Sequence, residues 1–175
     1  MKFTEAQLES VVIDLLKAEG IPHVLGSHIV RDKSEVLIKD DLRQFLQKRY
    51  KTDGITANEV SGIIRSLEQL PASDLYDTNK TIMKKVMDGF ALKREDRSKK
   101  DLWVYLIDYD QPESNNFKFV NQLEIQGYEL RIPDGILYIN GLPLVVFEFK
   151  SAIREDATIH DAYKQLTVRY ERDIP

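Results

Sequence analysis

The chain has no cysteine among its 175 residues. This absence excludes disulfide bridges, thiolate metal sites and cysteine nucleophiles, and it suits the reducing cytoplasm, where we expect the protein to reside. Long hydrophobic runs are also absent, since the longest, Leu142 to Phe147, contains a proline and is far too short to span a bilayer. Met1-Lys2-Phe3 leads into an amphipathic stretch, so the sequence shows no export signal and predicts no membrane partner.

Two further absences narrow the chemistry. The three histidines, His23, His28 and His160, have no metal-ligand spacing. No G-x-x-x-x-G-K-[ST] loop is present, which excludes P-loop binding of ATP by this stretch of chain. The formal net charge is -4, so nucleic acid would have to bind through a local patch.

The composition, with 42% hydrophobic and 31% charged residues, is typical of a globular protein. The length predicts one domain over residues 1–175. Thr4 to Gln7 and Thr56 to Glu59 have the form of capping boxes, and each precedes apolar residues at helical spacing. The predicted helices span about residues 5–19, 40–50, the segment from the second capping box to Pro71, 73–88 and 156–170.

Strand-like segments are concentrated in the second half of the chain. The predicted strands span residues 102–109, 117–126, 129–139 and 144–150, with turn residues between them. Residues 28–38 have a mixed pattern that fits a short strand or a loop, and the charged run Lys93 to Lys100 predicts a solvated loop. The order is helix, helical insertion at about 40–90, four strands and helix, which predicts an α/β or α+β sheet domain.

The last predicted strand carries charged residues in an apolar run. Residues 144–149 are apolar except for Glu148, and Lys150 follows. Because these two are separated by two positions, a strand places both on one face. Burying a carboxylate and an ammonium is unfavourable unless an ion pair, or a metal ion with a charged substrate, compensates.

Asn140-Gly141 predicts a hairpin turn that brings Asp134 close to Glu148. In the register of a plain two-residue turn, Asp134 lies opposite Phe147 and on the wrong face. A three-residue loop or a bulge sets Asp134 opposite Glu148, and opposed residues of an antiparallel pair point to the same side. Pro143 cannot donate to the ladder and weakly favours such irregular pairing. A functional role therefore requires the longer loop or a bulge.

In that register one face carries Asp134, Glu148 and Lys150. Two carboxylates can hold a hard divalent cation, which we expect to be Mg²⁺, with Mn²⁺ able to substitute. Such an ion activates a bound water and neutralises charge on a phosphate during in-line attack. Lys150 would orient that water or stabilise the charge that builds on the phosphate. This is the chemistry of phosphodiester hydrolysis.

At these residues the sequence resembles a known family. Pro133-Asp134 followed by Glu148-Phe149-Lys150 resembles the PD-(D/E)xK nuclease motif, and the wider context is more specific. That context is Phe119 to Leu123, Pro133-Asp134-Gly135 and Asn140 to Lys150. It resembles the N-terminal nuclease domain of the R (restriction) subunit of type I restriction-modification enzymes, most densely from about Val104 to the end.

The resemblance implies a restriction-endonuclease-like core with a mixed central sheet flanked by helices. It also implies a Mg²⁺-dependent endodeoxyribonuclease, a type I site-specific deoxyribonuclease, acting on double-stranded DNA. Its partners would be the methylation and specificity subunits, with recognition supplied by the latter. Family R subunits carry a helicase-like motor after this domain, so we expect an N-terminal fragment of a longer subunit, with ATP dependence residing in the motor.

The resemblance also implies roles for further residues. The metal ligands would be Asp134, Glu148 and the backbone carbonyl of Phe149. In related nucleases an acid on the first helix can complete the metal site, and Glu9 is the first candidate here, with Glu5 the second.

Gln165 and Tyr170 fit a glutamine and tyrosine that the family places near the active site and DNA, where they help couple cleavage to translocation. On an ideal α-helix a separation of five residues places them about 140° apart. They would converge only if the helix bends or their long side chains meet. Arg131, Lys118 and Arg154 are candidates for phosphate contacts.

Structural roles remain open for each of these residues. Asp134 could simply end a turn, and Glu148 with Lys150 could form a structural ion pair or face solvent on an edge strand. Tyr170 could pack on the helix, and first-turn acids suit the helix dipole. Two other functions also remain open: another PD-(D/E)xK nuclease of repair or recombination, and a non-catalytic module for DNA binding or assembly.

Overall fold

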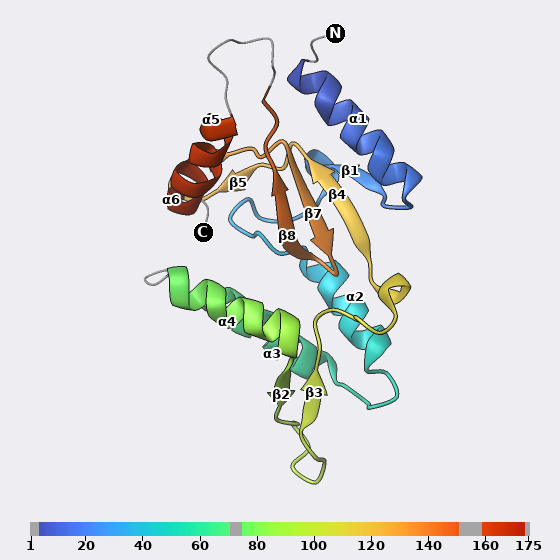
Figure 1. Ribbon diagram of the computed structural model, residues 1–175. Coiled ribbons are helices and arrows are strands. Elements are labelled where there is room, and N and C mark those ends of the chain that lie inside the picture. Colours follow the sequence, from blue (N-terminus) through green and yellow to red (C-terminus); the bar gives the residue numbers. More distant parts are fainter. Residues whose placement is uncertain (1–3, 71–74, 151–158, 174–175) are drawn as a thin grey trace. The chain divides into compact units, whose positions relative to one another are not determined.

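The computed structural model describes residues 4–70, 75–150 and 159–173. The chain divides into two compact units, which are described separately (Figure 1). One unit combines Met1–Ile38 with Phe117–Pro175 and is called the sheet unit below. The other, Lys39–Asn116, is called the inserted unit. Within the described ranges no helix is both long and apolar enough to cross a membrane.

The sheet unit begins with helix α1 (Glu5–Ala18), close to the predicted bounds. The predicted capping box is present, because the Thr4 hydroxyl accepts from the Gln7 amide at 3.2 Å and the Gln7 side chain accepts from the Thr4 amide at 2.9 Å. None of its side chains is fully buried. Its partly buried apolar side chains are those of Leu8, Val12, Ile13 and Leu16. Polar contacts therefore add to partial hydrophobic packing in fixing its position.

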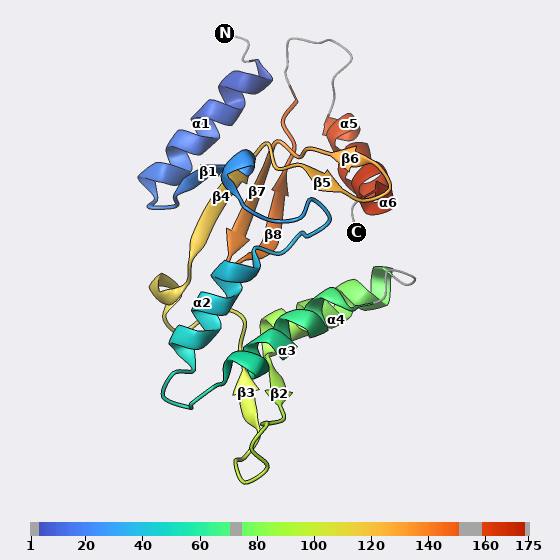
Figure 2. The same cartoon turned by 180° about the vertical axis from the view of Figure 1, so that it is seen from behind.

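Four strands form a mixed sheet in the order β1-β4-β7-β8, visible from behind in Figure 2. The strands are β1 (His23–Leu25), β4 (Phe117–Asn121), β7 (Gly135–Ile139) and β8 (Leu142–Phe147). β1 runs parallel to β4, and the other two pairs are antiparallel. The predicted mixed sheet is confirmed, but the sequence did not indicate β1, whose three residues are too few to show a strand period.

The β7–β8 hairpin combines a tight turn with a bulge. Asn140 and Gly141 have φ angles of 52° and 80°, as a two-residue hairpin turn requires. Tyr138 pairs with Pro143, whereas the preceding residue of β7 pairs with Val145, so Leu144 is the extra residue of a bulge. The bulge shifts the register of the hairpin by one position.

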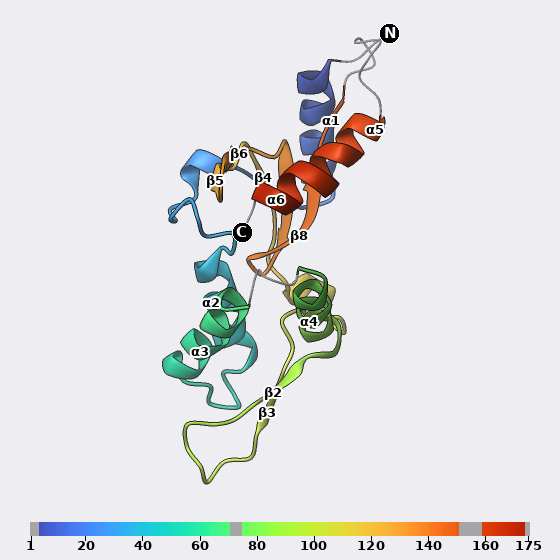
Figure 3. The same cartoon turned by 90° about the vertical axis from the view of Figure 1, so that its left-hand side faces the viewer.

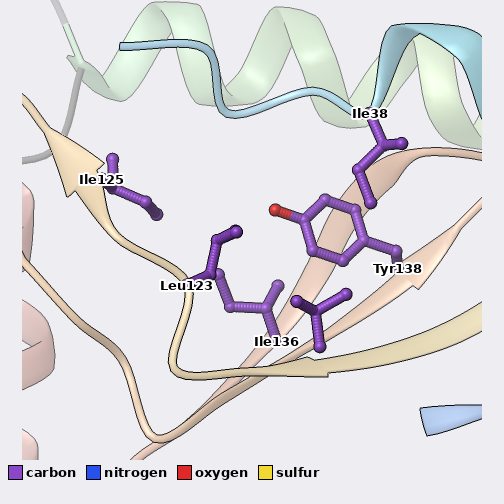
Figure 4. Close-up of a cluster of buried hydrophobic side chains, with 6 residues drawn as sticks. Ile38, Leu123, Ile125, Ile136 and Tyr138 are labelled. Atoms are coloured by element: carbon purple, nitrogen blue, oxygen red, sulfur yellow. The ribbon is translucent and has the colours of Figure 1, made fainter. Parts of the chain in front are cut away.

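One side of the sheet packs on a hydrophobic cluster formed with the segment before the inserted unit (Figure 4). The buried members are Ile38, Val120, Leu123, Ile125, Ile136 and Tyr138. The Tyr138 hydroxyl donates to the Val36 carbonyl at 3.0 Å, and burial raises the pKa of this phenol. The cluster thus fixes the strands whose ends carry the candidate site.

The sheet unit ends in a helical segment that lies in Figure 3 across the strands. It consists of α5 (Ile159–Lys164), the π-helical turn η3 (Gln165–Tyr170) and α6 (Glu171–Asp173). The predicted helix started at residue 156, and its first residues lie outside the described ranges. A short hairpin of β5 (Ile125–Gln126) and β6 (Leu130–Arg131) is held to this segment by ion pairs from Arg131 to the buried Asp173.

The inserted unit contains the three predicted helices, α2 (Lys39–Arg49), α3 (Ala57–Glu68) and α4 (Leu75–Asp88). It also contains the antiparallel pair β2 (Phe90–Leu92) and β3 (Leu102–Val104). The expectation that residues 102–109 join the central sheet is therefore wrong. Of these residues, Leu102–Val104 pair locally with β2, and the next amide, that of Tyr105, donates to the Tyr50 hydroxyl instead of to a strand. Further on, Asp108 folds the chain into a turn by accepting from two following amides.

The sequence predicted a solvated loop for the run Lys93 to Lys100, but the run is not solvated throughout. Arg94 is buried and pairs with Glu59 at 2.9 Å, and it also donates to the carbonyls of Asp53 and Gly54. Glu59 is the residue that closes the capping box of α3. One member of the basic run is thus a structural residue of the inserted unit.

Candidate active site

The end of the β7–β8 hairpin brings together the two predicted carboxylates. The last ladder pair is Gly135 with Phe147, so the next position sets Asp134 opposite Glu148. The bulge supplies the one-residue shift that the prediction required, after a turn of only two residues. Asp134 Oδ2 accepts a hydrogen bond from the Phe149 amide at 2.6 Å. This bond links the residues on either side of the hairpin just beyond its last ladder pair.

Gly135 determines how closely the strands approach beside this carboxylate. A Cβ atom at this position would lie 2.2 Å from Cζ of Phe119, whose side chain is fully buried. The ring of Phe119 meets Phe147 edge to face at 5.3 Å, so the ring cannot retreat without breaking that contact. Only glycine fits here, and Asp134 is thereby held at the end of the hairpin.

Glu148 and Lys150 lie on one face, as their spacing predicted, and they bind one another. Lys150 Nζ donates to Glu148 Oε1 at 2.6 Å, and the two side chains are 23% and 3% exposed. Burial would lower the pKa of Lys150, but the hydrogen bond and the charge of Glu148 outweigh it, so the pKa is raised. Lys150 is therefore a cation at neutral pH.

Tyr170 and Gln165 reach the same carboxylate. The Tyr170 hydroxyl donates to Glu148 Oε2 at 2.9 Å, and the Gln165 amide donates to the Tyr170 oxygen at 3.1 Å. The angle of 140° expected on an α-helix does not apply, because residues 165–170 form a π-helix. Its hydrogen bonds join residues five apart, which stacks these two positions. The sequence pointed to both residues but not to the helix type that unites them.

The Asp134 carboxyl is half-buried beside two acids and one cation. Burial raises the pKa of this carboxyl, and the charges of Glu148 and Glu9 raise it further, whereas the Phe149 amide and the charge of Lys150 oppose the shift. A cation at this place would favour the ionised carboxylate. The electrostatics therefore suit a cation site.

Two acids of the first helix, Glu5 and Glu9, act on different groups of this site. Glu9 contributes to the raised pKa of Asp134, whereas Glu5 contributes to the raised pKa of Lys150. Glu9 Oε1 also accepts a hydrogen bond from the side chain of Asn121 at 2.7 Å. Across the described parts of the chain, no three histidine, aspartate or glutamate side chains are grouped so as to hold a metal ion. The candidate site therefore rests on the two carboxylates of Asp134 and Glu148, which lie opposite one another beyond the β7–β8 ladder.

Two residues of this network were missed by the sequence analysis. Asn121 appeared there only within a stretch that resembles the family, and His23 was noted only for its lack of metal-ligand spacing. Their side chains meet at 2.8 Å across the parallel strands β1 and β4. A buried polar residue at the end of an apolar strand was the available signal for Asn121, whereas His23 gave none.

The candidate phosphate contacts differ in their environments. Arg131 is held in ion pairs with Asp173 and Glu129, so its charge already has partners. Lys118 lies on β4, and Arg154 lies outside the described residues. The structure thus adds no support for Arg131 as a free cation beside a phosphate.

Comparisons with known proteins show which family this chain resembles over its length. A family model described as the type I restriction enzyme R protein N terminus matches residues 2–175. The HindI endonuclease subunit of Haemophilus influenzae, a type I restriction enzyme, is 30% identical over 167 residues, which is 94% of this chain and 16% of that protein. A putative type I enzyme subunit of Methanocaldococcus jannaschii, MjaIXP, is 26% identical over 180 residues, which is 96% of this chain and 17% of that protein.

This chain spans about a sixth of the length of these two relatives. The family match covers both units, including the region before residue 104, where the resemblance in sequence was less dense. The chain belongs to the family of type I restriction enzyme R protein N-terminal regions.

Proposed function

We propose that this chain carries the Mg²⁺-dependent endodeoxyribonuclease site of a type I restriction enzyme R subunit, which hydrolyses phosphodiester bonds of double-stranded DNA. The observation that carries the proposal is the meeting of Asp134, Glu148 and Lys150 at the end of the β7–β8 hairpin. Two strand ends, a bulge and a glycine that fits against Phe119 are needed to bring them together. A structural ion pair alone would not need Asp134 there.

The donor set fits a hard divalent cation. Asp134 and Glu148 offer carboxylate oxygens, and the Phe149 carbonyl belongs to the residue whose amide already binds Asp134. Each carboxylate oxygen can accept more than one partner, so the present hydrogen bonds leave room for an ion. Bound Mg²⁺ would supply an activated water and neutralise phosphate charge.

Lys150 acts as a cation in this proposal rather than as a base. Its raised pKa keeps the ammonium protonated at neutral pH. An ammonium beside Glu148 can orient the attacking water through a hydrogen bond and stabilise negative charge that develops on the phosphate. Tyr170, which donates to the other oxygen of Glu148, holds this carboxylate in position.

The setting of the reaction is part of the same proposal, and it is supported by the relatives, whose names describe endonuclease subunits of type I restriction enzymes. As the resemblance in sequence implies, the chain would work in the cytoplasm within a complex containing methylation and specificity subunits. The dependence on ATP would reside in the motor region of the complete subunit. The family match favours this role over that of a repair or recombination nuclease.

The test is calorimetric titration of the 175-residue chain with Mn²⁺. The wild type is compared with Asp134→Asn and Glu148→Gln, and with Glu113→Gln as a matched control at an exposed acid of the inserted unit. We expect binding to be lost in the first two variants and kept in the control. Equal, weak binding by all four proteins would contradict the proposal and favour a non-catalytic DNA-binding or assembly module.

A further inference from the structure

Asn121 links the first helix to the sheet beside the proposed metal site. The residue ends β4, is 6% exposed and pairs in register with Gly135, the neighbour of Asp134. Its side chain contacts Glu9 on one side and His23 on the other, at 2.7 and 2.8 Å. A buried amide in contact with two residues from separate elements has the properties of a positioning group.

The charges fix the direction of both hydrogen bonds. An ionised Glu9 can only accept, so Asn121 must present its NH₂ group to that carboxylate. Its oxygen then faces His23, whose Nε2 must carry a proton in order to donate. With the other tautomer the amide would turn its oxygen toward the carboxylate, and two acceptors would meet. The chain from His23 through Asn121 to Glu9 is therefore consistent in one arrangement only.

Glu9 lies on a helix whose side chains are all exposed or partly buried, so a hydrogen bond to the sheet helps to fix its position. Its carboxylate contacts Asn121, and Gly135, the register partner of Asn121, is the neighbour of Asp134. We propose that Asn121, oriented by His23, is the positioning residue that holds Glu9 beside Asp134, where Glu9 adds a third carboxylate charge to the cation site. The inference rests on the function proposed above.

In this arrangement Glu9 acts on the ion indirectly, without binding it as a ligand. It does not form a three-carboxylate cluster with Asp134 and Glu148 in the described residues. Magnesium keeps several of its waters when it binds to proteins, so a carboxylate beyond ligand distance can still accept a hydrogen bond from one of them. Its charge also attracts the ion through space. Asn121 acts only through Glu9.

The experiment is a double-mutant cycle on Mn²⁺ affinity, measured by calorimetry with the 175-residue chain. Glu9→Gln removes the charge but keeps an oxygen that can accept from Asn121, and Asn121→Leu removes the amide at similar volume. We expect each single variant to bind Mn²⁺ about 5- to 10-fold more weakly, as one charge acting on a divalent ion across several ångströms would give. The double variant should bind like Glu9→Gln, within about twofold.

Two further variants keep the inference testable if Asn121→Leu unfolds. Glu9→Asp preserves the charge on an exposed helix but withdraws it from Asn121, and should weaken binding nearly as much as Glu9→Gln. His23→Gln keeps a donor for Asn121 and should retain affinity, whereas His23→Phe should lose part of it.

Each outcome bears on one of the two proposals. If Asn121→Leu weakens Mn²⁺ binding by the same factor in the Glu9→Gln variant as in the wild type, Asn121 does not act through Glu9. In that case its role is merely structural, and the inference is overturned. Full affinity of Glu9→Asp would overturn it as well. If the wild type binds no Mn²⁺, or if Glu148→Gln binds as tightly as the wild type, the proposed function fails and the inference falls with it.

Discussion

Both units of the molecule contain a buried carboxylate paired with a cation, but the two pairs are built differently. In the inserted unit, Glu59 and Arg94 are 2% and 5% exposed, and backbone groups surround them. Glu59 accepts from the amides of Thr56 and Glu95 as well as from the guanidinium. Burial raises the pKa of Glu59, but these hydrogen bonds outweigh it and the pKa is lowered. The pair is stabilised as an ion pair by fixed partners.

In the sheet unit, the hydrogen bonds to Glu148 come from the side chains of Lys150 and Tyr170. The neighbouring Asp134 has a raised pKa, chiefly because it is buried. Side-chain partners can rotate away more easily than backbone amides. In the function proposed above Glu148 binds a cation, and partners that can move away would allow this, whereas the backbone donors of Glu59 keep that carboxylate occupied.

The largest loss of stability should follow from breaking the ion pair of Glu59 and Arg94. Arg94→Met leaves Glu59 buried without its cation, and we expect the free energy of unfolding of the inserted unit to fall by about 3 kcal/mol. The single tryptophan, Trp103, lies on β3 of this unit, so its fluorescence during urea unfolding reports the change. Arg65→Met, at an exposed position of α3, is the control and should change stability little.

Lys150→Met tests the other side of the comparison. We expect it to destabilise the sheet unit less than Arg94→Met destabilises the inserted unit, because Tyr170 still donates to Glu148. Hydrogen exchange of the β7 and β8 amides measures this effect. A larger loss for Lys150→Met than for Arg94→Met would contradict the distinction between the two pairs.

The second prediction compares the change in stability on replacing a glycine by alanine in each unit. Gly135→Ala places a methyl group against the buried Phe119 ring, and overpacking of this kind costs about 2 kcal/mol. Gly62, inside α3, has nothing within 4 Å of an added Cβ. Gly62→Ala should therefore raise stability by about 0.5–1 kcal/mol.

Hydrogen exchange on the two variants measures both changes. Faster exchange of β7 and β8 amides is expected only in Gly135→Ala, together with weaker Mn²⁺ binding as Asp134 is displaced. If Gly135→Ala were as stable as the wild type, the close approach to Phe119 would not be what fixes this strand end.

Local sequence signals predicted much of this architecture. The capping boxes at Thr4 and Thr56 mark helix starts because they involve neighbours in sequence. The hairpin at Asn140 followed from turn chemistry, and the need for a bulge followed from requiring Asp134 and Glu148 on one face. These predictions depend on few residues that lie close together in the chain.

Features that depend on distant contacts were not predicted. Strand β1 exists because it pairs with β4, almost a hundred residues later, and residues 102–104 pair with β2 rather than with the central sheet. Arg94 looked like one charge in a basic run, and only its contact with Glu59 makes it structural. The π-helix that unites Gln165 with Tyr170 has no local pattern from which it could have been predicted.

A third, smaller effect concerns the pair of Glu148 and Lys150 in the sheet unit. Tyr170→Phe removes the hydroxyl that binds Glu148, and loss of one such hydrogen bond should lower stability by about 1 kcal/mol. Because this hydroxyl holds Glu148 in position, Mn²⁺ should bind a few-fold more weakly to the variant, as measured by calorimetry. Tyr163→Phe, at an exposed tyrosine on α5, is the matched control. Unchanged or tighter Mn²⁺ binding by Tyr170→Phe would show that the phenol does not position Glu148 for the ion.

The smallest effect is an opposite dependence on pH of two carboxyl groups, measured in the absence of metal. The pKa of Glu59 is lowered by folding from 4.5, so its ionised form adds stability above pH 4.5 that is lost as the pH falls through the lowered value. The pKa of Asp134 is raised by folding from 3.8, so its contribution is present below pH 3.8 and is lost as the pH rises through the raised value.

Glu59→Gln should therefore be less stable than the wild type at neutral pH, with the difference shrinking in acid. Asp134→Asn should be more stable than the wild type at neutral pH, and its difference should also shrink in acid. Urea unfolding between pH 3 and pH 7 measures both trends, with Trp103 fluorescence following the inserted unit and hydrogen exchange the sheet unit. If Asp134→Asn were less stable at neutral pH, the carboxylate would be a stabilising structural group, and the contrast between the two units would be lost.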